Sequence, residues 1–101
     1  MSKLITIIIP AYNEEETLPD IISRLTKLAK RIDSYDFEFL FVNDGSRDHT
    51  SDLLSSFAKH DPRVSYINLS RNFGKEIAVA AGIDYERLRS EERRVGKECR
   101  S

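Results

Sequence analysis

Three short segments of the sequence combine an aromatic ring, carboxylates and cations, which are the groups that bind a nucleotide. The segments are residues 10–14, 43–48 and 70–75, and their candidate binding residues are Pro10, Tyr12, Glu14, Asp44, Arg71 and Lys75. A nucleotide needs a ring face for its base, an acceptor for a base N–H, partners for its hydroxyls and cations for its phosphates. The three segments can meet that need only if the fold brings them together.

Each of the three segments follows a stretch that is typical of a buried strand. Strands are predicted over residues 4–9, 37–42 and 64–69, which are rich in apolar and β-branched residues. Helices are predicted over residues 17–32, around the apolar residues 53–58, and from near Gly74 onward. This alternation predicts an α/β layered domain with a parallel sheet. The loops that follow the strands then share one edge, where ligands bind in open α/β sheets.

The same residues argue against three other nucleotide or signalling folds. The four glycines do not form the G-x-G-x-x-G pattern of a dinucleotide-binding domain. Gly74 and Lys75 are followed by Glu76, where a phosphate-binding loop of the Walker type has Ser or Thr. The third strand ends in residues 68–70, Asn-Leu-Ser, without the aspartate that a phosphate-accepting receiver domain needs.

Composition narrows the class of protein further. A chain of 101 residues fits one small domain, and its net charge of -1 gives no general attraction to nucleic acid. The single cysteine, Cys99, cannot form an internal disulfide, and the two histidines are not spaced with it as zinc ligands. No apolar run reaches the roughly 20 residues of a membrane-spanning helix, and no secretory signal is evident. A cytoplasmic location is therefore expected.

The last sixteen residues differ in composition from the rest. Residues 86–101 carry six Lys or Arg and four Asp or Glu, a net charge of +2, and only two aliphatic residues, Leu88 and Val95. This composition suits a solvated helix end with a frayed terminus. It also suits a charged tail that does not belong to the reading frame of the preceding residues. We favour the second interpretation, so that residues 1–85 form the domain and residues 86–101 are a non-native or disordered tail.

The three loop segments resemble successive blocks of the family 2 glycosyltransferases. The matching blocks are Ile-Pro-Ala-Tyr-Asn-Glu-Glu at residues 9–15, Val-Asn-Asp-Gly-Ser-Arg-Asp at residues 42–48, and Ser-Arg-Asn-Phe-Gly-Lys at residues 70–75. They stand in the family's order, and the third is most similar to the branch that transfers a sugar to polyprenyl or dolichyl phosphate. The resemblance implies the Rossmann-like N-terminal half of a glycosyltransferase A-type fold, truncated near residue 85.

The resemblance also implies a role for each candidate residue. Tyr12, next to Pro10, would lie against the base of a UDP- or GDP-sugar, and Asp44 would accept a hydrogen bond from a base N–H. Glu14 would lie near the ribose. Two cations would reach toward the base or the diphosphate, where they offset the charge of the leaving group. These cations are Arg71 and Lys75.

Each of these roles has a structural alternative that the sequence leaves open. Asp44 with Gly45 can form a tight turn, and Glu14 can favour the dipole of the following helix. Tyr12 can be an aromatic that packs within a loop, and Lys75 can be a solvated helix residue. Arg47 and Asp48 are interpreted as turn and helix-cap residues rather than as ligands.

The chain departs from the family pattern at the metal site. Family members continue into a strand that ends in Asp-x-Asp, whose carboxylates hold Mg²⁺ or Mn²⁺ on the sugar diphosphate, and this chain contains no Asp-x-Asp. No catalytic or metal-binding residue is therefore assigned here. The resemblance implies a hexosyltransferase that works at the cytoplasmic face of a membrane on a lipid phosphate acceptor, of which this part is inactive alone. The alternative is a noncatalytic nucleotide-binding or interaction fragment.

Overall fold

The chain folds into a three-stranded parallel sheet with three helices, as the sequence predicts. The structure is a computed structural model that describes residues 3–94. Its elements in chain order are β1 (Lys3–Ala11), α1 (Leu18–Arg31), β2 (Tyr35–Asn43), α2 (Thr50–His60), β3 (Val64–Asn68) and α3 (Lys75–Arg94). All strand pairs are parallel, and β2 lies between β1 and β3. The predicted α/β class and the order of the elements are confirmed.

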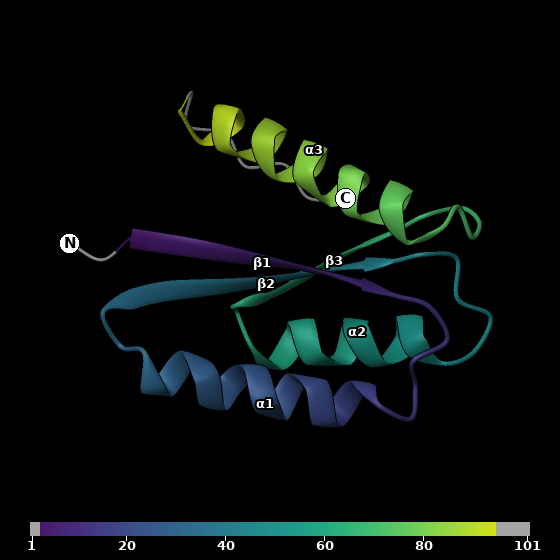
Figure 1. Ribbon diagram of the computed structural model, residues 1–101, viewed down its shortest axis with the longest axis horizontal. Helices are drawn as coiled ribbons and strands as arrows, with labels where there is room; N and C mark the ends of the chain where they lie inside the picture. Colours follow the sequence, from purple (N-terminus) through teal and green to yellow (C-terminus); the bar gives the residue numbers. More distant parts are fainter. Residues whose placement is uncertain (1–2, 95–101) are drawn as a thin grey trace.

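The helices lie on both faces of the sheet. Helices α1 and α2 cover one face, and α3 crosses the other face, where it contacts β1 and β2 (Figure 1). The central strand is consequently buried from both sides, and Leu40, Phe41 and Val42 have no exposed surface. This explains why residues 37–42 have almost no polar positions, since both faces of a strand in such a sheet are covered.

One apolar core fills the space between the sheet and the pair α1 and α2. Its buried members come from all of these elements and are Leu18, Phe37, Phe39, Phe41, Leu54 and Val64. Odd-numbered residues of β1 and β2 face this core because successive side chains of a strand point to opposite faces. The alternate residues Ile8 and Val42 face α3. The core therefore fixes which face of each strand each helix covers.

Helix α1 begins where the sequence predicts, next to the first candidate loop. The backbone N–H groups of Thr17 and Leu18 donate to the carbonyl oxygen of Glu14, and a proline occupies the first turn. Proline is favoured there because its missing N–H would have no partner within the helix. The last turn contains Lys30 and Arg31, whose charges complement the negative end of the helix dipole.

Helix α3 continues beyond the segment that resembles the glycosyltransferase family. It begins at Lys75, close to the predicted start, and its backbone is helical through Arg94. The helix thus includes the first part of the segment 86–101 that we expect to be a charged tail. Residues 95–101 lie outside the described part of the chain, so the expectation for them stays a prediction. Among residues 3–94, no helix is long and apolar enough to cross a membrane.

Gly82 allows α3 to lie close to the sheet. A Cβ atom at this position would come within 2.7 Å of Ile8 Cγ2 and 3.0 Å of Val42 Cγ2. Each of these methyl groups is attached to the Cβ atom of a β-branched strand residue, so it has little freedom to move aside. The lack of a side chain at Gly82 therefore sets the distance between α3 and strands β1 and β2.

We predict that Gly82→Val lowers the free energy of unfolding by about 1–3 kcal/mol, the usual cost of forcing extra methyl groups into a packed interface. Chemical denaturation followed by circular dichroism measures the loss. Ala80→Val is the matched control, because Ala80 is exposed on the same helix and its replacement costs only the difference in helix propensity, about 0.5 kcal/mol. Equal losses in the two variants would show that close packing at Gly82 is unimportant.

Candidate functional site

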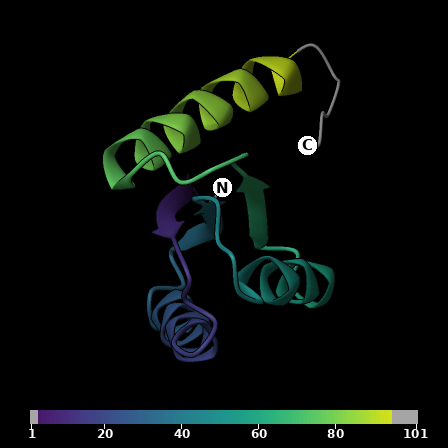
Figure 2. The ribbon, with the colours of Figure 1, turned by 90° about the vertical axis from the view of Figure 1, so that its right-hand side faces the viewer.

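The loops that follow β1, β2 and β3 meet at the carboxyl edge of the sheet. Figure 1 shows them together at one end of the molecule, and Figure 2 views that end directly. We call them loop 1 (residues 12–17), loop 2 (residues 44–49) and loop 3 (residues 69–74). The sequence predicted this meeting from the parallel order of the strands, and it is confirmed.

Loops 1 and 2 are joined by hydrogen bonds between backbone and side chain. The N–H of Asn13 donates to Ser46 Oγ at 2.9 Å, and the N–H of Arg47 donates to Asn13 Oδ1 at 2.8 Å. Farther along, the N–H of Glu14 donates at 2.8 Å to Oγ1 of the fully buried Thr50. Polar side chains of one loop thus satisfy backbone groups of the other, which holds both loops in fixed positions.

Loops 2 and 3 are joined by the carboxylate of Asp44. Its Oδ1 accepts a hydrogen bond from the N–H of Phe73 at 2.9 Å, and its Oδ2 accepts from the N–H of Gly74 at 3.0 Å and from Asn72 Nδ2 at 3.0 Å. Asp44 is only 3% exposed. Because α3 begins at Lys75, this buried negative charge lies at the positive end of that helix. Asp44 therefore fixes where α3 starts relative to β2.

The backbone of loop 3 passes directly against Gly45. This glycine has a φ of +71°, and a Cβ atom there would lie 2.3 Å from the carbonyl carbon of Arg71 and 2.4 Å from the nitrogen of Asn72. No side chain can occupy that space without moving the loop backbone. Gly45 is thus required both by its own conformation and by the close approach of loop 3.

We predict that Gly45→Ala destabilises the protein more than Gly74→Ala does. Both glycines have positive φ, so both variants carry backbone strain of about 1–3 kcal/mol. Only the first variant also places a methyl group against backbone atoms, because nothing lies within 4 Å of a Cβ at Gly74. Unfolding free energies from chemical denaturation compare the two. A larger loss in Gly74→Ala would contradict the close packing of loops 2 and 3.

Most of the predicted binding residues line one small cavity. This cavity, of about 300 Å³, lies between loop 1 and the start of α3, and we call it the α3-side cavity. Five of the six candidates line it, namely Pro10, Tyr12, Glu14, Asp44 and Lys75. The side chains of Tyr12 and Lys75 are exposed and reach the solvent beside it. The fold therefore brings together an aromatic ring, two carboxylates and a cation.

Two of these five residues also have structural partners. Asp44 holds α3 through the three hydrogen bonds described above, which occupy three of the roughly four acceptor positions of a carboxylate. Glu14 Oε2 accepts a hydrogen bond from Thr17 Oγ1 at 2.7 Å, just before α1. Asp44 and Glu14 therefore have structural roles in this fold, although the bonds of Asp44 run to loop 3 and are not those of a turn with Gly45.

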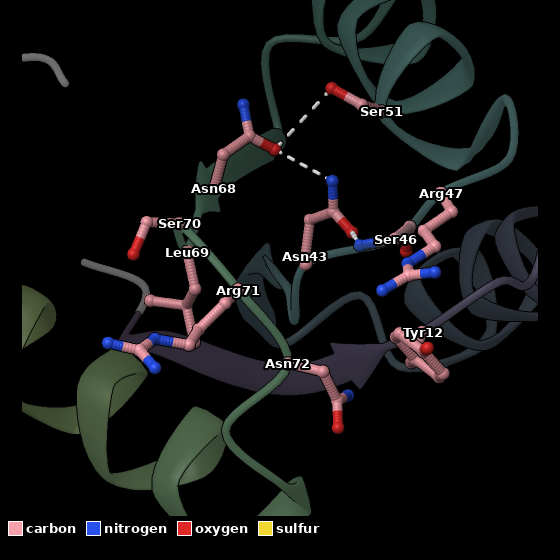
Figure 3. A pocket seen from close by; sticks show the side chains of 11 residues that line it. Tyr12, Asn43, Ser46, Arg47, Ser51, Asn68, Leu69, Ser70, Arg71 and Asn72 are labelled. Carbon is pink, nitrogen blue, oxygen red and sulfur yellow. Dashed lines mark hydrogen bonds between the residues drawn. The ribbon is translucent and has the colours of Figure 1, made fainter.

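The sixth candidate, Arg71, lines a larger and more polar cavity on the other side of Tyr12. This second cavity has a volume of about 520 Å³ and lies between loops 2 and 3, so we call it the β3-side cavity (Figure 3). Tyr12 lines both cavities. The Arg71 guanidinium lies over the Phe73 ring, 5.3 Å from its centroid. Arg71 and Lys75 therefore belong to different cavities, although the sequence analysis grouped them.

The β3-side cavity contains residues that the sequence analysis did not select as ligands. The buried Asn43 donates from Nδ2 to Asn68 Oδ1 at 2.9 Å, and Ser51 Oγ lies 3.5 Å from the same oxygen. Arg47 was interpreted as a turn residue, yet its side chain lines the cavity as well. Both β2 and β3 end in an asparagine, Asn43 and Asn68, and the register of the sheet pairs these two positions. Two polar residues at the ends of predicted strands were therefore the signal that the sequence offered.

Asp48 accepts hydrogen bonds from the first residue of α2, although the N-cap position that was predicted for it is occupied by His49. Its Oδ1 accepts hydrogen bonds from the N–H of Thr50 at 2.9 Å and from Thr50 Oγ1 at 2.6 Å, and its Oδ2 accepts from the N–H of Glu15 at 3.3 Å. Desolvation acts to raise the pKa of the Asp48 carboxyl, but the hydrogen bonds from Thr50 and Glu15 outweigh it and hold that pKa below its ordinary value. The charged form is thus favoured by folding.

We predict that Asp48→Asn lowers the free energy of unfolding at pH 7 and that this loss becomes smaller in acid. Because the folded-state pKa is below the ordinary value of 3.8, the stabilisation is complete above that value and is lost as the pH falls through the folded-state pKa. Urea denaturation at pH 7 and near pH 3 measures this difference. Asp52→Asn, an exposed change in the same helical turn, is the control. If Asp48→Asn loses the same free energy of unfolding at both pH values, the charged Asp48 carboxylate does not stabilise the fold.

The described residues do not form the metal site that the family resemblance implies. No group of three or more His, Cys, Asp or Glu side chains within the described residues is placed to hold a metal ion. The acidic residues of loop 1 are instead engaged near helix starts, as with Glu15, which lies 3.4 Å from His49 Nδ1. The part of the chain that the structure describes therefore does not fit a divalent metal.

Comparison with known proteins agrees with the α/β fold. The family model described as glycosyl transferase family 2 matches residues 6–87. This match covers more than half of the chain and includes all three loops. The chain therefore belongs to glycosyltransferase family 2.

Curated relatives match over the same part of the chain. A prophage bactoprenol glucosyl transferase homolog of Escherichia coli (strain K12) is 40% identical over 80% of this chain and 26% of its own length. A bactoprenol glucosyl transferase of Shigella phage SfX is 38% identical, with the same coverage. An uncharacterized glycosyltransferase, YkcC, of Bacillus subtilis (strain 168) is 42% identical over 79% of this chain and 24% of its own length. The chain thus spans about a quarter of the length of these relatives.

Proposed function

We propose that this chain forms the donor-binding part of a glycosyltransferase that moves a hexose from a UDP- or GDP-sugar to a polyprenyl phosphate. The observation that carries the proposal is the α3-side cavity, where five residues predicted from the family blocks line one space at the carboxyl edge of the sheet. That edge is the usual ligand site of open α/β sheets.

The α3-side cavity has the groups that a nucleoside diphosphate needs. Tyr12 is 41% exposed and offers a ring face for a base. Pro10 and Ala11 also line the cavity, and the remaining acceptor position on Asp44 Oδ1 can take a base N–H. Lys75, in the first turn of α3, supplies a positive charge for a phosphate. A base against Tyr12 and phosphates toward Lys75 is the arrangement that these groups favour.

The acceptor side of the proposal is supported by the relatives. Two of them are named as bactoprenol glucosyl transferases or homologs, and bactoprenol is a polyprenyl lipid. Transfer of a hexose to its phosphate is therefore the reaction that we propose for the complete enzyme. Because no group of three or more His, Cys, Asp or Glu side chains among the described residues is placed to hold a metal ion, we assign this chain donor binding and propose that it does not transfer sugar alone.

Nucleotide binding to the 101-residue chain tests the proposal. We expect UDP or GDP to bind measurably by isothermal titration calorimetry, and Tyr12→Ala to weaken binding by about 1–3 kcal/mol, the usual contribution of one base stacked on an aromatic ring. Lys75→Gln should also weaken binding, because it removes a charge from the phosphate side. Both side chains are exposed, so neither change should disturb the fold.

Lys59→Gln serves as the control for net charge. Lys59 is exposed in the last turn of α2, away from the carboxyl edge. Its replacement should leave the affinity for the nucleotide unchanged. The proposal fails if neither nucleotide binds, or if Tyr12→Ala and Lys75→Gln bind as tightly as the Lys59→Gln control.

A further inference from the structure

The outer edge of β1 has no partner strand within residues 3–94. The sheet order is β1-β2-β3, so β1 pairs with β2 alone in this part of the chain. Figure 2 shows β1, in purple, at one side of the sheet, with α3 over one face and α1 over the other. The opposite edge belongs to β3, which has five residues, whereas β1 has nine. The longer of the two edge strands therefore has its outer backbone groups unpaired.

The composition of β1 is that of a central strand rather than of an edge strand. Residues 4–9 are Leu-Ile-Thr-Ile-Ile-Ile, without a charge or a proline. Edge strands of natural proteins are usually short, or they carry charges, prolines or bulges that discourage further pairing. The side chains of Ile5, Ile7 and Ile9 pack on the core but are only partly buried. β1 thus keeps apolar surface that a neighbouring strand would cover.

Alternate residues of β1 direct their backbone groups to the free edge. The carbonyl oxygen of Ala11 accepts a hydrogen bond from the N–H of Asp44 at 2.8 Å, which places the backbone groups of Ala11 on the β2 side. The N–H and C=O of one strand residue lie on the same side, and this side alternates along the strand. Leu4, Thr6 and Ile8 therefore direct both groups outward. These residues present one half of a strand ladder.

A second copy of β1, running antiparallel, matches this edge. Residues that face each other in an antiparallel pair can exchange two backbone hydrogen bonds. With Thr6 opposite Thr6 of the second copy, Leu4 faces Ile8 of the second copy, and Ile8 faces its Leu4. Every outward N–H of residues 4–8 then has an acceptor, and Pro10, which has no N–H, lies beyond the paired segment. The arrangement is two-fold symmetric, as most homodimers are.

The charges at the two ends of β1 also favour an antiparallel second copy. Lys3 is exposed at the first residue of the strand, whereas loop 1, which follows the last residue, contains Glu14, Glu15 and Glu16. The antiparallel register places Lys3 of each copy opposite Ile9 of the other, at the end that leads into the acidic loop. A parallel register would instead place like charges together at both ends, which is destabilising.

Exposed apolar side chains lie close to the free edge. Leu28 and Ile32, at the end of α1, and Leu4, at the start of β1, are each more than a third exposed. Figure 1 shows the end of α1 and the start of β1 at the same end of the molecule. A two-fold axis perpendicular to the sheet keeps both α1 helices on one face of the joined sheet. Their exposed apolar residues can then add to the contact between the strands.

We propose that two copies of this chain associate through β1 and form one continuous sheet across a two-fold axis. The paired segment, residues 4–8, lines neither the α3-side cavity nor the β3-side cavity. Association through β1 is therefore independent of the proposed donor binding, and either can fail without the other.

Analytical ultracentrifugation of the 101-residue chain over a range of concentrations tests the proposal. We expect a reversible equilibrium between monomer and dimer. Thr6→Pro should raise the dissociation constant by about tenfold or more, because it removes one outward N–H from each copy. This N–H is not bonded to β2, so the fold should persist in the circular dichroism spectrum. Thr6→Val is the matched control, because it keeps the N–H and removes only the bond from Thr6 Oγ1 to Glu38.

Two further measurements keep the test independent of how well Thr6→Pro folds. Lys3→Glu should weaken the dimer, because it places a negative charge toward the acidic loop of the other copy, whereas Lys59→Glu on α2 should not. Hydrogen exchange at the amides of Thr6 and Ile8 should slow as the concentration of the chain rises.

Three outcomes would overturn the proposal. The first is a chain that stays monomeric while the amides of Thr6 and Ile8 exchange freely, which would leave the edge to a strand of another polypeptide. The second is a dimer in which these amides remain unprotected, which would place the contact elsewhere. The third is growth into larger species without a dimer, which would show that the contact is not two-fold.

Discussion

The buried carboxylate of Asp44 is the interaction on which the rest of the site depends. It stands at the end of the central strand and receives two backbone N–H groups and one side-chain amide from loop 3. An ionised carboxylate is costly to bury unless hydrogen bonds compensate for its lost hydration. Asp44 has three such bonds and the positive end of α3 beside it. This side chain therefore holds the start of α3, and with it Lys75, against the end of β2.

Hydrogen bonds and close packing among the three loops then shape two cavities at the edge of the sheet. Ser46 and Thr50 hold loop 1, and Gly45 admits the backbone of loop 3 at close distance. Tyr12 stands between the cavities and lines both. Loops that are held to one another in this way need little rearrangement to receive a ligand. Such preorganisation lowers the entropy cost of binding.

The elements were predictable from the sequence, whereas the partners of individual loop side chains were not. Apolar periodicity indicated each strand and helix, since buried faces impose a period that is visible along the chain. The roles of Asp44 and Arg47 depend on contacts with residues about 30 positions away, Phe73 and Asn13, and sequence spacing does not encode such contacts. The same limit explains why Arg71 and Lys75 were grouped at one site, although loop 3 turns between them and directs them to different cavities.

Amide hydrogen exchange in Asp44→Asn tests the central role of this carboxylate most directly. Asparagine keeps the shape of the side chain but removes its charge and one acceptor oxygen. If Asp44 holds the start of α3, the N–H groups of Phe73 and Gly74 should exchange at least about tenfold faster in the variant, while the amide of Phe41 in the central strand keeps its protection. Unchanged exchange at Phe73 and Gly74 would contradict the account.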